Sequence, residues 1–143
     1  MSERIVIISD TQVPYEDRRA VRAVIGFIGD YQPDRVIHIG DLMDYPQPSR
    51  WNKDSRGEYE GSIHDDSEHC KRFFLEPLRA VYGGPVEVHE GNHDERPRVY
   101  LEKYAPALSG PAATAFNFEN LLDFDGFGIV KLPDFNEVAP GWI

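Results

Sequence analysis

Three short apolar segments, each followed by polar residues and then by helix-like spacing, constrain the fold of this chain most strongly. The segments are RIVIIS at 4–9, DRVIHIG at 34–40 and PVEVHE at 85–90. Such β-branched apolar runs are typical of strands buried on both faces of a sheet. Helical spacing of apolar residues over 17–31, and a helix expected over 66–84, separate the three strands. We therefore expect an α/β fold with right-handed βαβ crossovers and a parallel or mixed sheet.

The remaining elements are expected to complete one domain that spans residues 1–143. Ser67 is expected to cap the helix over 66–84, which Pro77 distorts and a glycine pair ends. Further helices are expected at 95–108 and 111–124, and further strands at 127–133 and 136–143. The polar segment 45–65, which contains two prolines, is expected to be a loop excursion.

Composition limits the classes of function. The formal net charge is −10, so a nonspecific basic surface for nucleic acid is excluded, and nucleic acid enters only as a substrate. No apolar run approaches the roughly 20 residues of a transmembrane helix, so we expect no membrane association. The single cysteine, Cys70, cannot form an internal disulfide, which makes the cytoplasm the expected compartment. An anionic substrate would need a local positive charge, and a divalent cation supplies one.

Polar side chains collect where the three strands end. The loops SDTQVP, GDLMDY and GNHDE follow the three strands, and the carboxyl ends of parallel strands meet at one edge of a sheet. Together they offer ligand-type side chains from Asp10, Gln12, Asp41, Asp44, Asn92, His93 and Asp94. Carboxylates this close repel one another unless a cation neutralises them, so the pattern predicts a divalent-metal site. Two cations could share one bridging carboxylate, with glycines beneath them that let the backbone turn tightly.

The motifs D-x-Q, GDLMD and GNHD resemble the first three motifs of the calcineurin-like metallophosphoesterases, whose pattern is D-x-H, G-D-x-x-D and G-N-H-[DE]. The loop SDTQVPYEDRRA and the tail EVAPGW are most similar to phage-encoded members, which would place the protein in the host cell cytoplasm. The resemblance implies the calcineurin-like metallophosphoesterase fold. This chain would be a partial version that lacks the second half of the αββα sandwich.

The resemblance also implies a set of metal ligands. Asp10 and Gln12 would hold a first metal, Asp41 would bridge to a second, and Asn92 would bind the second. Gln12 stands where the family usually has histidine, which favours Mn²⁺ or Mg²⁺ over Zn²⁺. We expect one or two divalent ions, with Mn²⁺ first and Mg²⁺, Fe or Zn²⁺ as alternatives. Gln12 could instead stand behind the ligands and leave the first metal loosely bound.

Two further residues receive catalytic roles by the same resemblance. His93 would face the leaving group, and Asp44 would hydrogen-bond its other ring nitrogen and keep the ring cationic. The nucleophile would be a metal-bound hydroxide, and the substrate a phosphomonoester or phosphodiester. Asp94 is interpreted as a carboxylate at a helix N-terminus. Arg50 and Arg96 are interpreted as solvated and are left out of the site.

The later family motifs, H and G-H-x-H, do not occur within 1–143. We therefore expect a truncated or split product that needs a complementing C-terminal polypeptide, associates with a second copy through its last strand, or is a nonfunctional remnant. The leading hypothesis is a metal-dependent phosphoesterase. The alternative is an inactive metal-binding or assembly module that keeps the fold.

Overall fold

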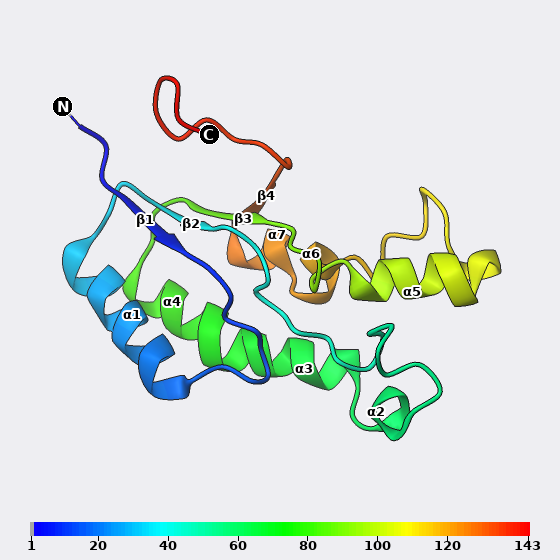
Figure 1. Ribbon diagram of the computed structural model, residues 1–143. Helices are drawn as coiled ribbons and strands as arrows, with labels where there is room; N and C mark the ends of the chain where they lie inside the picture. Colours follow the sequence, from blue (N-terminus) through cyan, green and yellow to red (C-terminus); the bar gives the residue numbers. More distant parts are fainter. Residues whose placement is uncertain (1) are drawn as a thin grey trace.

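Four parallel strands form a single sheet in the order β1-β2-β3-β4 (Figure 1). The computed structural model describes residues 2–143. The strands are β1 (Ile5–Ile8), β2 (Arg35–His38), β3 (Val86–His89) and β4 (Ile129–Leu132). Every neighbouring pair is parallel. The structure thus confirms the expected α/β architecture, with a purely parallel sheet.

The α-helices cover one face of this sheet or lie beyond its strand ends (Figure 1). They are α1 (Arg18–Tyr31), α2 (Arg56–Tyr59), α3 (Ile63–Cys70), α4 (Glu76–Val81), α5 (Arg96–Tyr104), α6 (Phe118–Leu121) and α7 (Phe124–Phe127). Figure 1 shows α1, α3, α4, α6 and α7 beneath the strands, with α5 extending beyond the strand ends. Side chains alternate along a strand, so Val36, Val86 and Ile129, which are paired in register, share the helix-facing side and the core.

The other face of the sheet is partly uncovered. Ile7, Ile39 and Val130 are 51%, 55% and 56% exposed there. The C-terminal segment crosses this face near β2, where Arg35 donates a hydrogen bond to the Val138 carbonyl at 3.3 Å. The expectation that the strand at 4–9 is buried on both faces is therefore wrong, because β1 is an edge strand and the helices cover only one side.

The helical segment expected over 66–84 begins earlier and is divided. Ser62, not Ser67, is the N-cap, and its hydroxyl accepts a hydrogen bond from the His64 amide at 3.1 Å. Ser67 lies buried inside α3. A π-helical turn over Lys71–Leu75 then separates α3 from α4. Pro77 lies in the first turn of α4, directly after this π-helical turn, which agrees with the expected distortion near Pro77.

Two other expected helices are shorter than predicted. The segment 95–108 ends its α-helix at Tyr104 and continues as a 3₁₀ turn over Pro106–Leu108. The single helix expected over 111–124 is wrong, because only α6 and the first residue of α7 are helical in that range. Asp123 has a left-handed backbone with φ of 52°, and this separates α6 from α7.

The last strand expected, over 136–143, is also wrong. Gly141 has φ of 79° and the chain turns back, so that the Val138 amide donates to the Trp142 carbonyl at 2.9 Å. Strand β4 is therefore the sheet edge at this end of the fold. The segment 45–65 is mostly irregular, and α2 is its one complete helix. Its first residue, Tyr45, is fully buried. Among the helices of residues 2–143, none has the length and apolar character that a transmembrane span requires.

Candidate metal centre

The loops after β1 and β2 are joined by backbone hydrogen bonds that continue the strand pairing. The Asp10 amide donates to the Gly40 carbonyl at 3.1 Å, and the Gln12 amide donates to the Asp41 carbonyl at 3.1 Å. Because the two loops lie side by side, the predicted ligands of both loops are neighbours at one sheet edge.

Three of the predicted ligands have an unusual backbone. Asp10, Gln12 and Asp41 are all left-handed, with φ of 51°, 54° and 54°. A non-glycine residue held in this region costs on the order of 1–3 kcal/mol and persists only where its surroundings demand it. Such residues cluster at functional sites, so this concentration in two adjacent loops makes the strand edge a candidate site.

Glycines allow the third loop to approach the second. Gly40 has φ of 113°, and a Cβ on Gly91 would lie 2.2 Å from Asp41 Oδ1 and 2.3 Å from the Asp41 nitrogen. The space occupied by the Asp41 carboxylate would be filled by the side chain of any larger residue at position 91. Its Oδ1 also accepts the His93 amide at 2.9 Å.

Gln12 lies against Asp41, with Nε2 at 3.5 Å from Oδ2. The side chains of Asp10 and Asn92 are exposed at the same edge. Within residues 2–143, no three His, Cys, Asp or Glu side chains gather closely enough to hold a metal ion. The available donors are therefore two carboxylates and two amides, all hard oxygen ligands, and this set fits Mg²⁺ or Mn²⁺ better than Zn²⁺.

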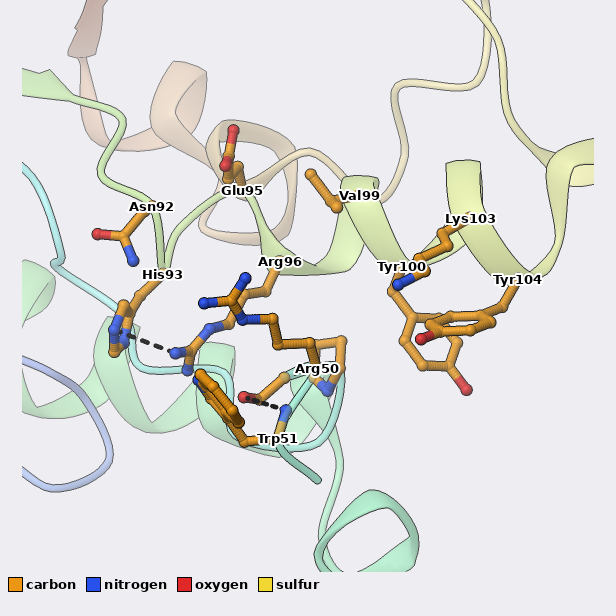
Figure 2. Close-up of a pocket in the computed structure, with 12 residues that line it drawn as sticks. Arg50, Trp51, Asn92, His93, Glu95, Arg96, Val99, Tyr100, Lys103 and Tyr104 are labelled. Atoms are coloured by element: carbon orange, nitrogen blue, oxygen red, sulfur yellow. Dashed lines mark hydrogen bonds between the residues drawn. The ribbon is translucent and has the colours of Figure 1, made fainter. Parts of the chain in front are cut away.

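His93 is held between two partners. Its Nδ1 lies 3.0 Å from Asp44 Oδ1, and its Nε2 lies 3.1 Å from Arg96 Nη2 (Figure 2). A guanidinium can only donate, so Nε2 accepts and Nδ1 carries the hydrogen toward Asp44. The contact between Nδ1 and Asp44 is the one that the resemblance implied, and the charge of the ring stays a prediction.

Arg96 is a site residue that the sequence interpretation missed. It also donates to the Asp44 carbonyl at 2.7 Å and lies 3.6 Å from the Asp44 carboxylate. Its position three residues after His93 was the available signal, because a tight turn leads from His93 into α5 and the Arg96 amide donates to the His93 carbonyl at 3.1 Å.

His38 joins the loops that follow β1 and β2. It is 1% exposed, its Nε2 lies 2.8 Å from Thr11 Oγ1, and its Nδ1 accepts the Gly40 amide at 3.2 Å. Burial lowers the pKa of His38 to about 4, and the charge of Asp10 opposes that shift only partly. The neutral ring thus pins the Thr11 loop to the Gly40 loop.

Asp94 connects the second loop to the third. It is fully buried, and its two carboxylate oxygens accept the Met43 amide and the Gly91 amide, each at 2.8 Å. Burial raises the pKa of Asp94 to about 6, although both hydrogen bonds lower it. The interpretation of Asp94 as a charge at a helix end is replaced by that of a clamp between loops.

Comparison with known proteins identifies the family and two relatives. A sequence model of the family described as calcineurin-like phosphoesterase matches residues 3–138. The chain is 64% identical to the Gene 54 protein of Mycobacterium phage L5 and 66% identical to the Gene 54 protein of Mycobacterium phage D29, over 143 residues in each case. Both alignments cover 100% of this chain and 56% of the relative. The chain therefore spans about half the length of these curated relatives.

Proposed function

This chain belongs to the calcineurin-like phosphoesterase family, and from that premise we propose that its strand-end loops bind a divalent metal ion and hydrolyse a phosphoester. The observation that supports this most is the left-handed backbone of Asp10, Gln12 and Asp41 in two adjacent loops. The family's chemistry depends on divalent metal. The activity of this particular chain is our proposal.

The proposed ligands are Asp10, Asp41 and Asn92, with Gln12 either binding the metal or holding the Asp41 carboxylate. Mn²⁺ is the proposed ion, because the donors are oxygens and neutral amides replace imidazole. When bound, the ion supplies positive charge that attracts phosphate oxygens and activates water. Gly91 keeps space for the Asp41 carboxylate in the loop that carries these groups.

His93 is proposed to contact the phosphoester at the mouth of the adjoining cavity, which it lines. Asp44 fixes the ring through Nδ1, and Arg96 fixes it through Nε2. A ring held at both nitrogens keeps one orientation. Because Nε2 accepts from Arg96, it would contact a phosphate oxygen as a donor only after it takes up a proton. Asp44 and Arg96 are thus proposed as positioning residues.

Metal titration combined with a hydrolysis assay tests the proposal. Calorimetry with MnCl₂ is expected to show binding that Asp41→Asn abolishes, and hydrolysis of bis-p-nitrophenyl phosphate is expected to require Mn²⁺ and the same carboxylate. Asp123→Asn is a matched control, since Asp123 is also left-handed but lies between α6 and α7. Wild-type metal affinity or turnover in Asp41→Asn would contradict the proposal.

An inactive metal-binding or assembly module is the second candidate. The absence of any cluster of three His, Cys, Asp or Glu ligands across residues 2–143 favours it. Calorimetry separates the two candidates. Binding of one Mn²⁺ without turnover supports the module, whereas turnover supports the enzyme.

We also propose that the exposed sheet face receives a complementing polypeptide, with a second copy paired at the β4 edge as the alternative. The apolar side chains of Ile7, Ile39 and Val130 supply the surface, and the relatives contain further sequence that this chain does not match. Co-expression with the unmatched part of the L5 protein is expected to produce a complex with increased turnover. The proposed site of action is the cytoplasm, where the free, buried Cys70 stays reduced.

A further inference from the structure

A cavity of about 550 Å³ begins at Asn92 and His93 and continues along α5 (Figure 2). Helix residues 96, 99, 100, 103 and 104 line it. These positions are spaced by three and four, so they form one face of the helix. From Arg96 to Lys103 the helix rises by roughly 10 Å. The cavity therefore has room for a substantial group attached to a phosphate at His93.

The wall of this cavity is cationic, although the whole chain carries a net charge of −10. Arg50, Arg96 and Lys103 line it, and its acidic residue, Glu95, is already paired with Arg98 at 3.2 Å. Within residues 2–143, Arg50 and Lys103 contact aromatic rings instead of carboxylates. Arg96 is itself paired with the Asp44 carboxylate at 3.6 Å, so Arg50 and Lys103 supply the uncompensated positive charge in a protein that would otherwise repel a polyanion.

Aromatic rings lie beside these cations. Trp51 is 76% exposed, and the Arg50 guanidinium lies over its ring at 4.6 Å from the centroid. Tyr104 is 39% exposed, and Lys103 Nζ lies 5.2 Å from its ring centroid. Figure 2 shows Trp51 and Arg50 beside Arg96 near His93, with Tyr104 and Lys103 at the far end. Exposed flat rings that alternate with cations suit a ligand with both bases and phosphates.

We propose that this cavity binds a single-stranded oligonucleotide, with a base stacked on Trp51 and neighbouring phosphates held by Arg50 and Lys103. The proposal rests on the proposed phosphoesterase function, because it places the nucleoside next to the bond that His93 faces. Unpaired bases are required, since a paired base does not expose its flat face for stacking. A phosphopeptide would satisfy the cations but would leave the Trp51 ring without a flat partner.

Binding is tested on the intact chain in EDTA, so that neither metal nor turnover is involved. The probe is a fluorescein-labelled tetrathymidylate followed by anisotropy. Trp51→Ala is expected to weaken binding by roughly tenfold or more, and Trp51→Phe to retain most of it. Arg50→Gln and Lys103→Gln are each expected to weaken binding and to reduce its salt dependence. Trp142→Phe is the matched control, since Trp142 is 73% exposed and does not line the cavity.

Two competitors distinguish the chemical source of affinity. An abasic tetramer of equal charge is expected to compete at least tenfold less well than tetrathymidylate, because it cannot stack. In the Trp142→Phe variant, tetrathymidylate is expected to quench the fluorescence of Trp51, whereas the abasic tetramer is not. Equal competition by the abasic tetramer, or stronger competition by a phosphoserine peptide, overturns the proposal, and so does wild-type affinity in Trp51→Ala. Failure of the Mn²⁺ hydrolysis assay alone overturns the proposed enzyme, and this binding test stands apart from it.

Discussion

Replacement of His38 should change how the stability of the fold depends on pH. The ring is buried, accepts the Gly40 amide through Nδ1 and contacts Thr11 through Nε2. Its pKa is lowered from 6.5 to about 4, mainly by burial. The unfolded chain therefore binds a proton as the pH falls below 6.5, whereas the folded chain stays neutral there until about pH 4. The stabilising contribution is complete above pH 6.5 and is lost as the pH falls toward 4.

The size of the effect follows from these two pKa values. At pH 5.5 the unfolded imidazole is mostly protonated and the folded one is not, so the loss of stability relative to pH 7.5 is about 1.4 kcal/mol. Measurement at pH 5.5 also stays above the isoelectric point of about 4.8. Asp94 acts in the opposite direction, because its raised pKa makes the folded state bind the extra proton below pH 6. The wild-type curve alone therefore conceals part of the His38 contribution.

A comparison of the wild type with His38→Gln isolates the His38 contribution to the pH dependence of stability. Glutamine retains a donor toward Thr11 but does not titrate, and loss of the acceptor for Gly40 should lower stability by about 1–3 kcal/mol at neutral pH. Urea unfolding followed by circular dichroism at pH 7.5 and 5.5 provides four free energies. The wild-type advantage should shrink by about 1.4 kcal/mol at the lower pH. An advantage that stays constant within about 0.3 kcal/mol would refute the assignment of a buried neutral ring.

Three other changes have distinct expected outcomes. Gly91→Ala should destabilise the fold by roughly 2–4 kcal/mol in thermal or urea unfolding, because its methyl group would overlap Asp41, whereas Gly83→Ala, with nothing within 4 Å, should be nearly neutral. Asp44→Asn should lower kcat by roughly tenfold or more, because it disturbs the orientation of His93. The Mn²⁺ affinity measured by calorimetry should change little, and an equal loss of Mn²⁺ affinity would contradict this role. Arg79→Met should lower the free energy of unfolding in urea by roughly 2–4 kcal/mol. The reason is that Arg79 donates to the carbonyls of Phe127, Gly84 and Gly128 at 2.7–2.8 Å. An unchanged urea midpoint would show that water replaces these hydrogen bonds.

The parallel sheet and the edge that carries the site were predictable from sequence, because each strand and its polar turn are local patterns. The family resemblance, confirmed by the match over residues 3–138, depended on the same local motifs. Whether the first strand is buried on one face or on both could not be predicted from its own sequence. It depended on which face the helices cover, and Ile7 remains half exposed for that reason.

Errors in helix and strand boundaries have identifiable causes. Ser62 and Ser67 are both acceptable caps by residue type, and only the packing of Ser67 against Tyr45, with hydroxyl oxygens 2.8 Å apart, decides between them. The tail 136–143 has strand-like composition, but the turn at Gly141 reverses it. Arg96 was named but left out of the site as solvated, although its contact with His93 is only three residues away. The contact of His38 with Thr11 spans 27 residues and could not be found from local sequence.

The carboxylate of Asp94 couples the motions of the second and third loops. Each of its oxygens secures one amide, Met43 on one side and Gly91 on the other, in a region closed to solvent. If either loop opened alone, one buried oxygen of Asp94 would lose its hydrogen-bond donor. Local opening of the second loop should therefore be accompanied by opening of the third loop. The amide hydrogens of Met43 and Gly91 should consequently exchange with deuterium at matched rates. The proposed ligands Asp41 and Asn92, which lie beside these two amides, would then keep a fixed spacing.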